Sequence, residues 1–230
     1  VEDCLVHHIP LATYRMFSLE EIAKDLHYIK FQQSESFQNH IEAFYQQEHG
    51  IIDAQWGTVL RDYQKEGVHW LLALRAYGFG GILADDMGLG KTLQIIAYWT
   101  SCERSLPALV ITSASLIYNW DDEIKKFRKD MRVLCVSGNA YEREECLNHY
   151  REYDMVITSY DYIRRDIGRY QTLNFDTVVL DEAQYIKNHK TQIAMAVKRL
   201  RCEHRFALSG TPIENSLAEL WSLFDFLMPD

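Results

Sequence analysis

The segment from Gly81 to Thr92 constrains this 230-residue chain more than any other part of its sequence. An apolar stretch runs into a glycine-bearing turn, which leads through Lys91 into an apolar helix. That order is the one a phosphate-binding loop requires. Gly88 and Gly90 would let backbone N–H groups point at phosphate oxygens, because glycine reaches the necessary dihedral angles without strain. The pattern predicts that Lys91 reaches the β- and γ-phosphates and that the Thr92 hydroxyl binds Mg²⁺.

An acidic pair supplies the second half of such a site. Asp181 and Glu182 directly follow the apolar run Val178–Leu180. Carboxylates at the end of an apolar strand suit Mg²⁺ coordination and activation of a water molecule, so we assign Asp181 to the metal and Glu182 to the attacking water. A solvated strand end is the alternative for this pair alone, and a chance glycine-rich turn is the alternative for the loop. Together the two segments favour nucleotide chemistry.

Short apolar runs alternate with amphipathic segments from residue 58 onward. The first helix of this region is expected to end at Gly78, and Ser115 is a candidate cap for the helix that carries Trp120. Runs that are almost continuously apolar are typical of strands covered on both faces. The alternation predicts an α/β fold, a mostly parallel sheet with helices on both faces. The expected strands are Gly81–Asp85, Ala108–Thr112, Arg132–Ser137, Met155–Ser159, Thr177–Asp181 and Arg205–Ser209.

Polar side chains stand at the carboxyl ends of five of these strands. In an open parallel sheet, ligands bind outside the carboxyl ends of the strands, so we expect these side chains to face one crevice. They are Asp85 and Asp86, Thr112 and Ser113, Ser159 to Asp161, Asp181 and Glu182, and Ser209 to Thr211.

Residues 1–57 differ from the remainder in charge. They hold nine acidic and three basic residues, which is a net charge of −6 out of −9 for the whole chain. Ser18 and Glu21 resemble a capping box that is followed by apolar residues at helical spacing. We therefore predict a helical appendage over residues 1–57 and an α/β domain over residues 58–230. A capping box at Ser216 and Glu219 predicts a last helix.

Composition excludes several classes of protein. An acidic chain is not expected to coat nucleic acid, so any such contact must come from a local patch. The sequence contains no apolar run of membrane-spanning length, and its first residues do not resemble a secretory signal. Five cysteines without a Cys-x-x-Cys pair indicate free thiols in a reducing compartment. We expect an intracellular protein, cytoplasmic or nucleoid-associated if bacterial, with no membrane contact.

Six segments resemble helicase motifs and occur in the expected order. Together they resemble the first RecA-like lobe of the SWI/SNF-type branch of superfamily-two helicases, over about residues 58–230. The Tyr77–Gly88 segment is similar to bacterial members. The segments are Leu60–Gln64 (the adenine-recognising Q motif), Asp85–Thr92 (motif I), Ala108–Trp120 (motif Ia), Thr158–Asp161 (motif Ib), Asp181–Asn188 (motif II) and Leu208–Asn215 (motif III), followed by Leu220–Phe224.

The resemblance implies an ATP-driven motor that uses Mg²⁺ and moves along double-stranded DNA. Arg61 and Gln64 would recognise adenine. Gln184, where DEAH-type relatives carry histidine, is expected to tune the coupling. The other residues implied are Asp85, Asp86, Met87, Gly88, Leu89, Gly90, Lys91 and Thr92 for ATP, Ser209, Gly210 and Thr211 for coupling, and Ser113 and Ser159 for nucleic acid. Asp85 stands where the strict loop pattern has glycine, as is usual in this branch.

The family's later motifs, IV to VI, are expected on a second RecA-like lobe of the same polypeptide. Those motifs supply arginine fingers, which can contribute about 10³–10⁵ in rate to phosphoryl transfer. We therefore expect the present lobe alone to be nearly inactive and interpret the chain as a fragment of a longer protein.

Nucleic-acid contacts and two rival functions stay open at this stage. Basic clusters such as Lys125-Lys126 and Arg164-Arg165 are better explained as solvated helix faces paired with acids such as Asp121 and Asp122. Backbone amides and hydroxyls at strand ends, around Ser113, Ser115, Ser159 and Tyr160, are the stronger candidates for phosphate contacts. A small-molecule kinase would need an acceptor pocket and a lid. A non-catalytic module would not need an intact loop and acidic pair.

Overall fold

A computed structural model describes residues 50–211 and 217–229 of the chain. Its strands are β1 (Gly81–Leu83), β2 (Ala108–Thr112), β3 (Val133–Cys135), β4 (Met155–Ser159), β5 (Asn174–Leu180) and β6 (Arg201–Leu208). Its α-helices are α4 (Asp62–Tyr77), α5 (Lys91–Thr100), α6 (Ile117–Phe127), α7 (Ala140–Asn148), α8 (Tyr160–Tyr170), α9 (Gln192–Lys198) and α10 (Leu217–Leu227). Single 3₁₀ turns are η1 (Ala54–Trp56), η2 (Ala114–Leu116), η3 (Tyr150–Glu152) and η4 (Ala183–Ile186).

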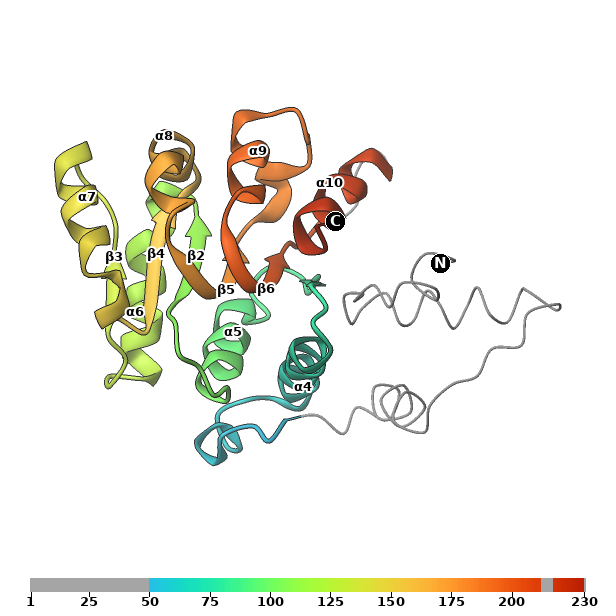
Figure 1. The fold of residues 1–230 in the computed structure, drawn as a ribbon. Coiled ribbons are helices and arrows are strands. Elements are labelled where there is room, and N and C mark those ends of the chain that lie inside the picture. Colours follow the sequence, from blue (N-terminus) through green and yellow to red (C-terminus); the bar gives the residue numbers. More distant parts are fainter. Residues whose placement is uncertain (1–49, 212–216, 230) are drawn as a thin grey trace, which may run out of the picture.

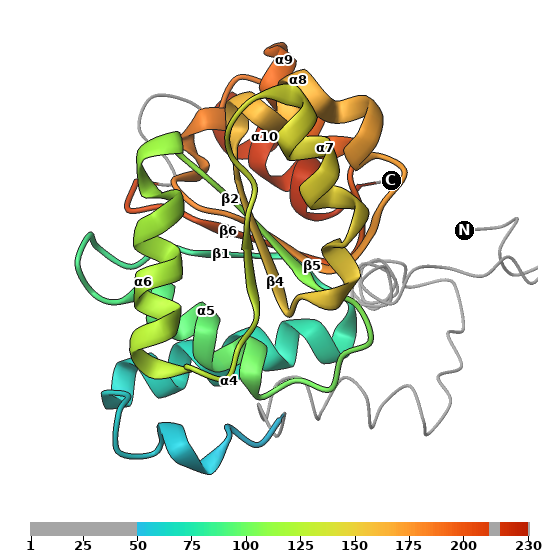
Figure 2. The ribbon, with the colours of Figure 1, turned by 90° about the vertical axis from the view of Figure 1, so that its left-hand side faces the viewer.

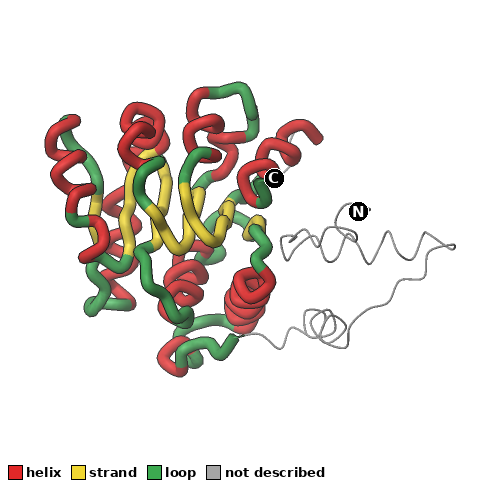
Figure 3. Tube along the Cα trace, in the orientation of Figure 1, coloured by secondary structure: helices red, strands yellow, loops and turns green. Residues whose placement is uncertain are grey.

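The six strands form one sheet in the order β1-β6-β5-β2-β4-β3, and every neighbouring pair is parallel. Helices cover both faces of this sheet (Figures 1 and 3). The predicted α/β fold is confirmed. Because all strands run the same way, the loops after β1, β5, β2 and β6 meet at one edge, as the sequence predicted.

Two apolar cores lie on opposite faces of the sheet. The first packs α4, α5 and α6 against the sheet and includes Trp56, Trp99 and Trp120. The second packs α7 to α10 and includes Tyr170 and Phe226. Figure 2 shows α4 and α5 on one side and α7 to α10 on the other. Strands β2 and β4 are buried along their whole length, which explains why their sequences are apolar without alternation.

Several predicted boundaries change in the structure. Strands β5 and β6 begin earlier than expected, at Asn174 and Arg201, because these two residues pair with each other and the ladder extends into polar sequence. Strand β3 is shorter, since it is an edge strand that pairs only with β4. The predicted cap at Ser115 is wrong. A 3₁₀ turn contains that residue, and α6 starts at Ile117 without a side-chain cap.

Other local predictions are confirmed. Helix α4 ends at Gly78, whose φ of 71° places it in the left-handed region that favours glycine. The four cysteines at described positions are free thiols, and Cys4 lies outside the described residues. No helix in the described part of the chain is long and apolar enough to cross a bilayer. The capping box at Ser18 and Glu21 and the residue Ser216 also lie outside the described residues.

The structure describes the junction at residue 57 from residue 50 onward. Trp56 is buried, and its indole N–H donates to the Thr100 hydroxyl at 2.8 Å. The Asp53 amide donates to the Ser101 hydroxyl at 3.0 Å. Residues 53–56 therefore pack on the end of α5. The division into an appendage and an α/β domain at residue 57 stays a prediction.

Candidate functional site

The predicted phosphate loop connects β1 to α5. Gly88 and Gly90 have φ angles of 84° and 81°, so both lie in the left-handed region that the sequence argument assigned to them. Gly90 is the residue before α5, which begins at Lys91. The Lys91 ammonium donates to the carbonyl oxygens of Asp85 and Asp86, at 2.7 and 3.0 Å. The loop thus curls around a cation at the amino end of a helix, where anions bind.

The start of α4 holds this loop from outside. The Tyr63 hydroxyl and the Gln64 amide both donate to the Leu89 carbonyl, at 3.1 and 3.0 Å. The Gln64 amide oxygen accepts from the Arg61 N–H at 3.0 Å. A Cβ atom on Gly90 would come within 2.5 Å of Gln64 Nε2, so this contact also requires glycine. Gln64 therefore supports the loop, and its predicted adenine contact, like that of Arg61, stays a prediction.

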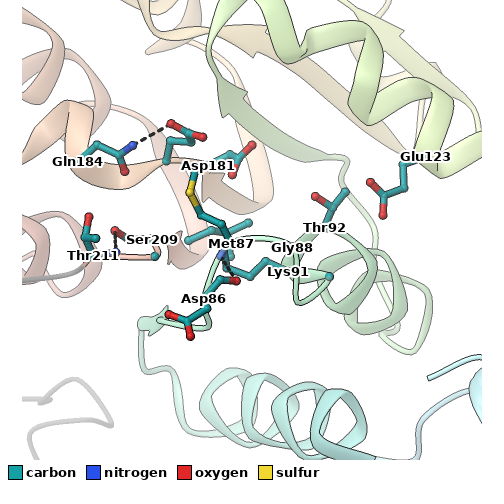
Figure 4. Close-up of a pocket in the computed structure, with 14 residues that line it drawn as sticks. Asp86, Met87, Gly88, Lys91, Thr92, Glu123, Asp181, Gln184, Ser209 and Thr211 are labelled. Carbon is teal, nitrogen blue, oxygen red and sulfur yellow. Dashed lines mark hydrogen bonds between the residues drawn. The ribbon is translucent and has the colours of Figure 1, made fainter. Parts of the chain in front are cut away.

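One cavity of about 640 Å³ joins the phosphate loop to the acidic pair. Figure 4 shows side chains from the loop, from the ends of β5 and β6, and from α6 around it. The lining residues are Asp86, Met87, Gly88, Gly90, Lys91, Thr92, Glu123, Asp181, Glu182, Gln184, Leu208, Ser209, Gly210 and Thr211. Twelve of these lining residues were predicted for the ATP site, the acidic pair or the coupling segment, so residues up to 125 positions apart in sequence face one space.

Asp181 is held by two donors on the side away from the solvent. The Thr112 hydroxyl and the Trp120 indole N–H both donate to Asp181 Oδ2, at 3.0 and 2.8 Å. Hydrogen bonds to an ionised carboxylate are shorter and stronger than neutral ones. They restrict the rotation of the side chain, which leaves the other oxygen, Oδ1, as the one available to a ligand in the cavity.

Glu182 has an unusual backbone. Its φ of 52° and ψ of 56° make it the only non-glycine residue with positive φ among those the structure describes. Such a conformation crowds Cβ against a carbonyl and occurs mostly where function or packing imposes it. The Gln184 amide donates to Glu182 Oε2 at 2.8 Å (Figure 4).

The turn after β6 packs against the phosphate loop. Ser209 is buried, and its amide extends the β1–β6 ladder by donating to the Leu83 carbonyl at 3.2 Å. Its hydroxyl accepts from the Thr211 amide at 3.1 Å. A Cβ atom on Gly210 would lie 3.4 Å from Met87, so the two turns are in contact distance. This turn therefore borders both the loop and the acidic pair.

Comparison with known proteins identifies the family. The model of the SNF2-related domain matches residues 63–230. The chain belongs to the SNF2-related domain family. It is 44% identical over 185 residues to YwqA of Bacillus subtilis, which is named as an ATP-dependent helicase/translocase, and 42% identical over 187 residues to human TATA-binding protein-associated factor 172.

A solved structure resembles this SNF2-related domain in sequence and in fold. It is the Sulfolobus solfataricus SWI2/SNF2 ATPase core in complex with dsDNA, with a TM-score of 0.68 and 41% identity over 74% of this chain and 36% of that chain. The alignments cover 78% of this chain but 20% of YwqA, and 74% of this chain but 10% of the human factor. The chain therefore spans a fifth or less of these relatives. The fold is the RecA-like lobe of the SWI2/SNF2 ATPase core.

Sequence reasoning missed Glu123 of this SNF2-related domain. Glu123 lies three residues after Trp120, on the same face of α6, and lines the cavity. Burial raises the pKa of Glu123, the nearby Lys126 opposes that rise, and Asp181 adds to it. The sequence signal that could have indicated Glu123 is its spacing, because residues three positions apart in a helix lie on the same face, here that of Trp120.

Some predicted site residues lie outside the cavity of the SNF2-related domain. Asp85 lies beneath the loop, where its carboxylate accepts from the Gln94 amide at 2.7 Å. The Ser113 hydroxyl is 3.1 Å from that of Ser115. Ser159 is buried, and its hydroxyl caps α8 by accepting from the Tyr162 amide. The nucleic-acid contacts assigned to Ser113 and Ser159 stay predictions.

Several basic residues on or next to the helices of the domain are paired with acids. This agrees with the sequence interpretation of these clusters as solvated helix faces. The ion pairs are Lys125–Asp121, Arg128–Asp130, Arg164–Asp161 and Lys198–Asp225.

Proposed function

We propose that this SNF2-related domain binds ATP with Mg²⁺ and, within the full-length protein, hydrolyses ATP to drive movement along double-stranded DNA. The observation that carries the proposal is the single cavity that contains both the phosphate loop and the acidic pair. The name of YwqA and the DNA complex of the Sulfolobus ATPase core support it.

The residues of the cavity have distinct roles in this proposal. Lys91 leaves the loop carbonyls to neutralise the β- and γ-phosphates, while the loop amides and the amino end of α5 bind phosphate oxygens. Thr92 and Asp181 offer hard oxygen ligands for Mg²⁺. No group of three or more His, Cys, Asp or Glu side chains in the described residues could hold a metal, which fits an ion that keeps waters and phosphate oxygens as ligands. Mg²⁺ supplies charge neutralisation of the triphosphate.

Glu182 orients the attacking water and accepts its proton. The left-handed backbone at this residue aims its side chain from the end of β5, and the hydrogen bond from Gln184 limits its rotation. Since Asp181 is held separately by Thr112 and Trp120, the two carboxylates can perform different tasks although they are adjacent in sequence.

Ser209 and Thr211 couple the nucleotide to a second RecA-like lobe. Their turn borders the phosphate loop and the acidic pair, so a change in bound phosphate alters its packing directly. The second lobe supplies the cationic side chains that complete the site, and without it we expect this lobe to turn over ATP very slowly.

The track is duplex DNA, contacted mainly through phosphates. Hydroxyls and backbone amides near Ser113 and Ser159, at the carboxyl edge of the sheet, are the proposed contact points. Contacts of this kind carry no base information, so binding is expected to be sequence-tolerant and to weaken as salt increases.

The first test replaces the phosphate-binding lysine. In the full-length protein, Lys91→Ala is expected to abolish phosphate release stimulated by duplex DNA. Lys65→Ala is the control, because the Lys65 ammonium pairs with Asp62 on the surface of α4 and does not line the cavity. Unchanged turnover in Lys91→Ala would remove the mechanism.

The second test separates binding from chemistry. Glu182→Gln is expected to keep nucleotide affinity within about twofold and to stop hydrolysis, because the amide cannot accept the proton. Loss of binding would mean that the roles are misassigned.

Titration with adenine and guanine nucleotides, then with small acceptor molecules, discriminates against a kinase. Absence of phosphate release by the unmodified full-length protein would favour a non-catalytic module.

A further inference from the structure

Tyr160 is a buried residue that contacts the acidic pair but does not line the cavity. It is the first residue of α8 and is 2% exposed. Its hydroxyl donates to the Asp181 carbonyl oxygen at 2.7 Å. Burial raises the pKa of Tyr160 well above its ordinary value, and the charges of Asp181 and Glu182 act in the same direction.

The carbonyl that Tyr160 binds belongs to the peptide bond between Asp181 and Glu182. A planar peptide unit can still rotate as a whole about the line that joins its two Cα atoms, and a hydrogen bond to its oxygen fixes that rotation. The plane of this peptide determines the φ angle of Glu182, which is in the left-handed region. Residues with a Cβ atom leave this region unless surrounding contacts hold them there. The Tyr160 hydroxyl is such a contact.

The ring of Tyr160 contacts the same turn a second time. It stacks on Tyr185, with ring centroids 4.7 Å apart and an interplanar angle of 24°. Tyr185 lies in η4, the 3₁₀ turn for which Glu182 is the N-terminal cap, and its amide donates to the Glu182 carbonyl at 3.2 Å. The hydroxyl thus holds the peptide before Glu182, and the ring holds the turn after it.

We propose that Tyr160 is a positioning residue that holds the turn 181–185 in the geometry that directs the Glu182 carboxylate into the cavity. Tyr160 does not itself line the cavity, so its effect passes through its hydrogen bond to Asp181 and thence to Glu182. The inference rests on the proposed function, because it assigns one more residue to the same reaction.

The test replaces Tyr160 by phenylalanine, which removes the hydroxyl and keeps the ring. Tyr170→Phe is the matched control. Tyr170 is a fully buried tyrosine of the same helix, and its hydroxyl donates to the Thr158 hydroxyl at 3.1 Å, away from the acidic pair. Both variants lose one buried hydrogen bond, but only one of these bonds reaches Asp181.

Hydrogen exchange of this chain provides a readout that does not require turnover. In Tyr160→Phe, the amides of residues 182–186 are expected to exchange about fivefold faster. This is the change in rate that corresponds to the net free energy of one hydrogen bond. In Tyr170→Phe, those amides are expected to keep the rate of the unmodified chain. Equal exchange in the two variants, or no change in Tyr160→Phe, would overturn the proposal.

Kinetics of the full-length protein provide the second readout. Tyr160→Phe is expected to lower kcat for DNA-stimulated ATP hydrolysis about tenfold and to leave KM for ATP within about twofold, because positioning acts on the chemical step. Tyr170→Phe is expected to change neither value. A raised KM with unchanged kcat would contradict the inference. If the unmodified protein shows no turnover, the proposed function has failed, and the exchange rates alone decide whether Tyr160 holds the turn.

Discussion

The ion pair between Arg75 and Asp176 joins the last turn of α4 to β5 at the edge of the sheet opposite the cavity. Two guanidinium nitrogens, Nη1 and Nη2, donate to the two carboxylate oxygens at 2.5 and 2.9 Å. The Thr177 hydroxyl adds a third hydrogen bond to the carboxylate at 2.7 Å, and Arg75 also donates to the Glu103 carbonyl. Asp176 is 3% exposed, so the pair is shielded from water.

Replacing Arg75 by alanine leaves the Asp176 carboxylate buried with Thr177 as its remaining partner. Breaking a buried pair by removing one partner typically costs about 3–5 kcal/mol, because the other charge stays desolvated. The pair is bidentate and its carboxylate is almost inaccessible, so we expect the Arg75→Ala variant to lose about 3–5 kcal/mol of the free energy of unfolding at pH 7.

The loss should depend on pH in a defined direction. Burial by itself would raise the pKa of Asp176, but the hydrogen bonds from Arg75 and Thr177 outweigh it, and the pKa lies below its usual value. A carboxyl with a lowered pKa contributes stability above its unfolded-state pKa and loses that contribution as pH falls through the folded-state pKa. Without Arg75, burial dominates and the pKa rises. Acid then destabilises the variant less than the unmodified chain.

Urea unfolding at pH 7 and at pH 4.5 measures both effects. The difference in stability between Arg75→Ala and the unmodified chain is expected to be largest at pH 7 and to shrink at pH 4.5, by about 1.4 kcal/mol for each unit by which the pKa of Asp176 in the variant lies above 4.5. Lys125→Ala is the control, since Lys125 and Asp121 form an exposed pair and its loss should leave the midpoint nearly unchanged. A loss below about 1 kcal/mol, or a difference that does not change with pH, would refute the reasoning.

Two further predictions concern the acidic pair. The free energy of unfolding should be about 1 kcal/mol larger for Glu182→Gly than for Glu182→Ala, because only glycine adopts the left-handed backbone there without strain. The urea midpoints of the two variants measure this difference. Equal midpoints would mean that the turn relaxes. Trp120→Phe should weaken Mg²⁺-dependent nucleotide binding about tenfold, since it removes a donor to Asp181, and titration of a fluorescent ATP with and without Mg²⁺ measures this. Trp99→Phe is its control, because the buried Trp99 N–H has no hydrogen-bond partner within the described residues, and an equal effect there would indicate packing alone.

Local sequence signals were sufficient for the parts of the site that lie within one segment. Gly88 and Gly90 adopt the positive φ angles expected of them, Lys91 begins a helix, and Asp181 follows an apolar strand. Each prediction depends on neighbouring residues in the chain, through dihedral preference or hydrophobic pattern. The same holds for the α/β fold, since alternating strands and helices leave few alternatives to a parallel sheet.

Contacts between distant segments had no such signal. The Gln64 side chain donates to the Leu89 carbonyl and accepts from the Arg61 N–H at the start of its own helix. The Trp120 indole donates to Asp181 across 61 positions of sequence. A tryptophan at helical spacing is adequately explained by burial, so nothing in its sequence context indicated a polar partner. Ser159 shows the converse. It ends a strand, where the sequence predicts a contact with nucleic acid, and only the structure shows that its hydroxyl caps the following helix.

The amino-acid sequence by itself therefore determined the phosphate loop, the acidic strand end and the layered sheet, because each is a property of consecutive residues. Only the tertiary structure decided the strand order β1-β6-β5-β2-β4-β3, which puts β6 between β1 and β5 and brings the segments after all three strands to one cavity. It also decided the left-handed backbone of Glu182, which contacts from Tyr160 and Tyr185 maintain. The strained backbone of such a residue is stabilised by contacts with side chains that are distant in sequence. Those contacts form only when the whole lobe is packed.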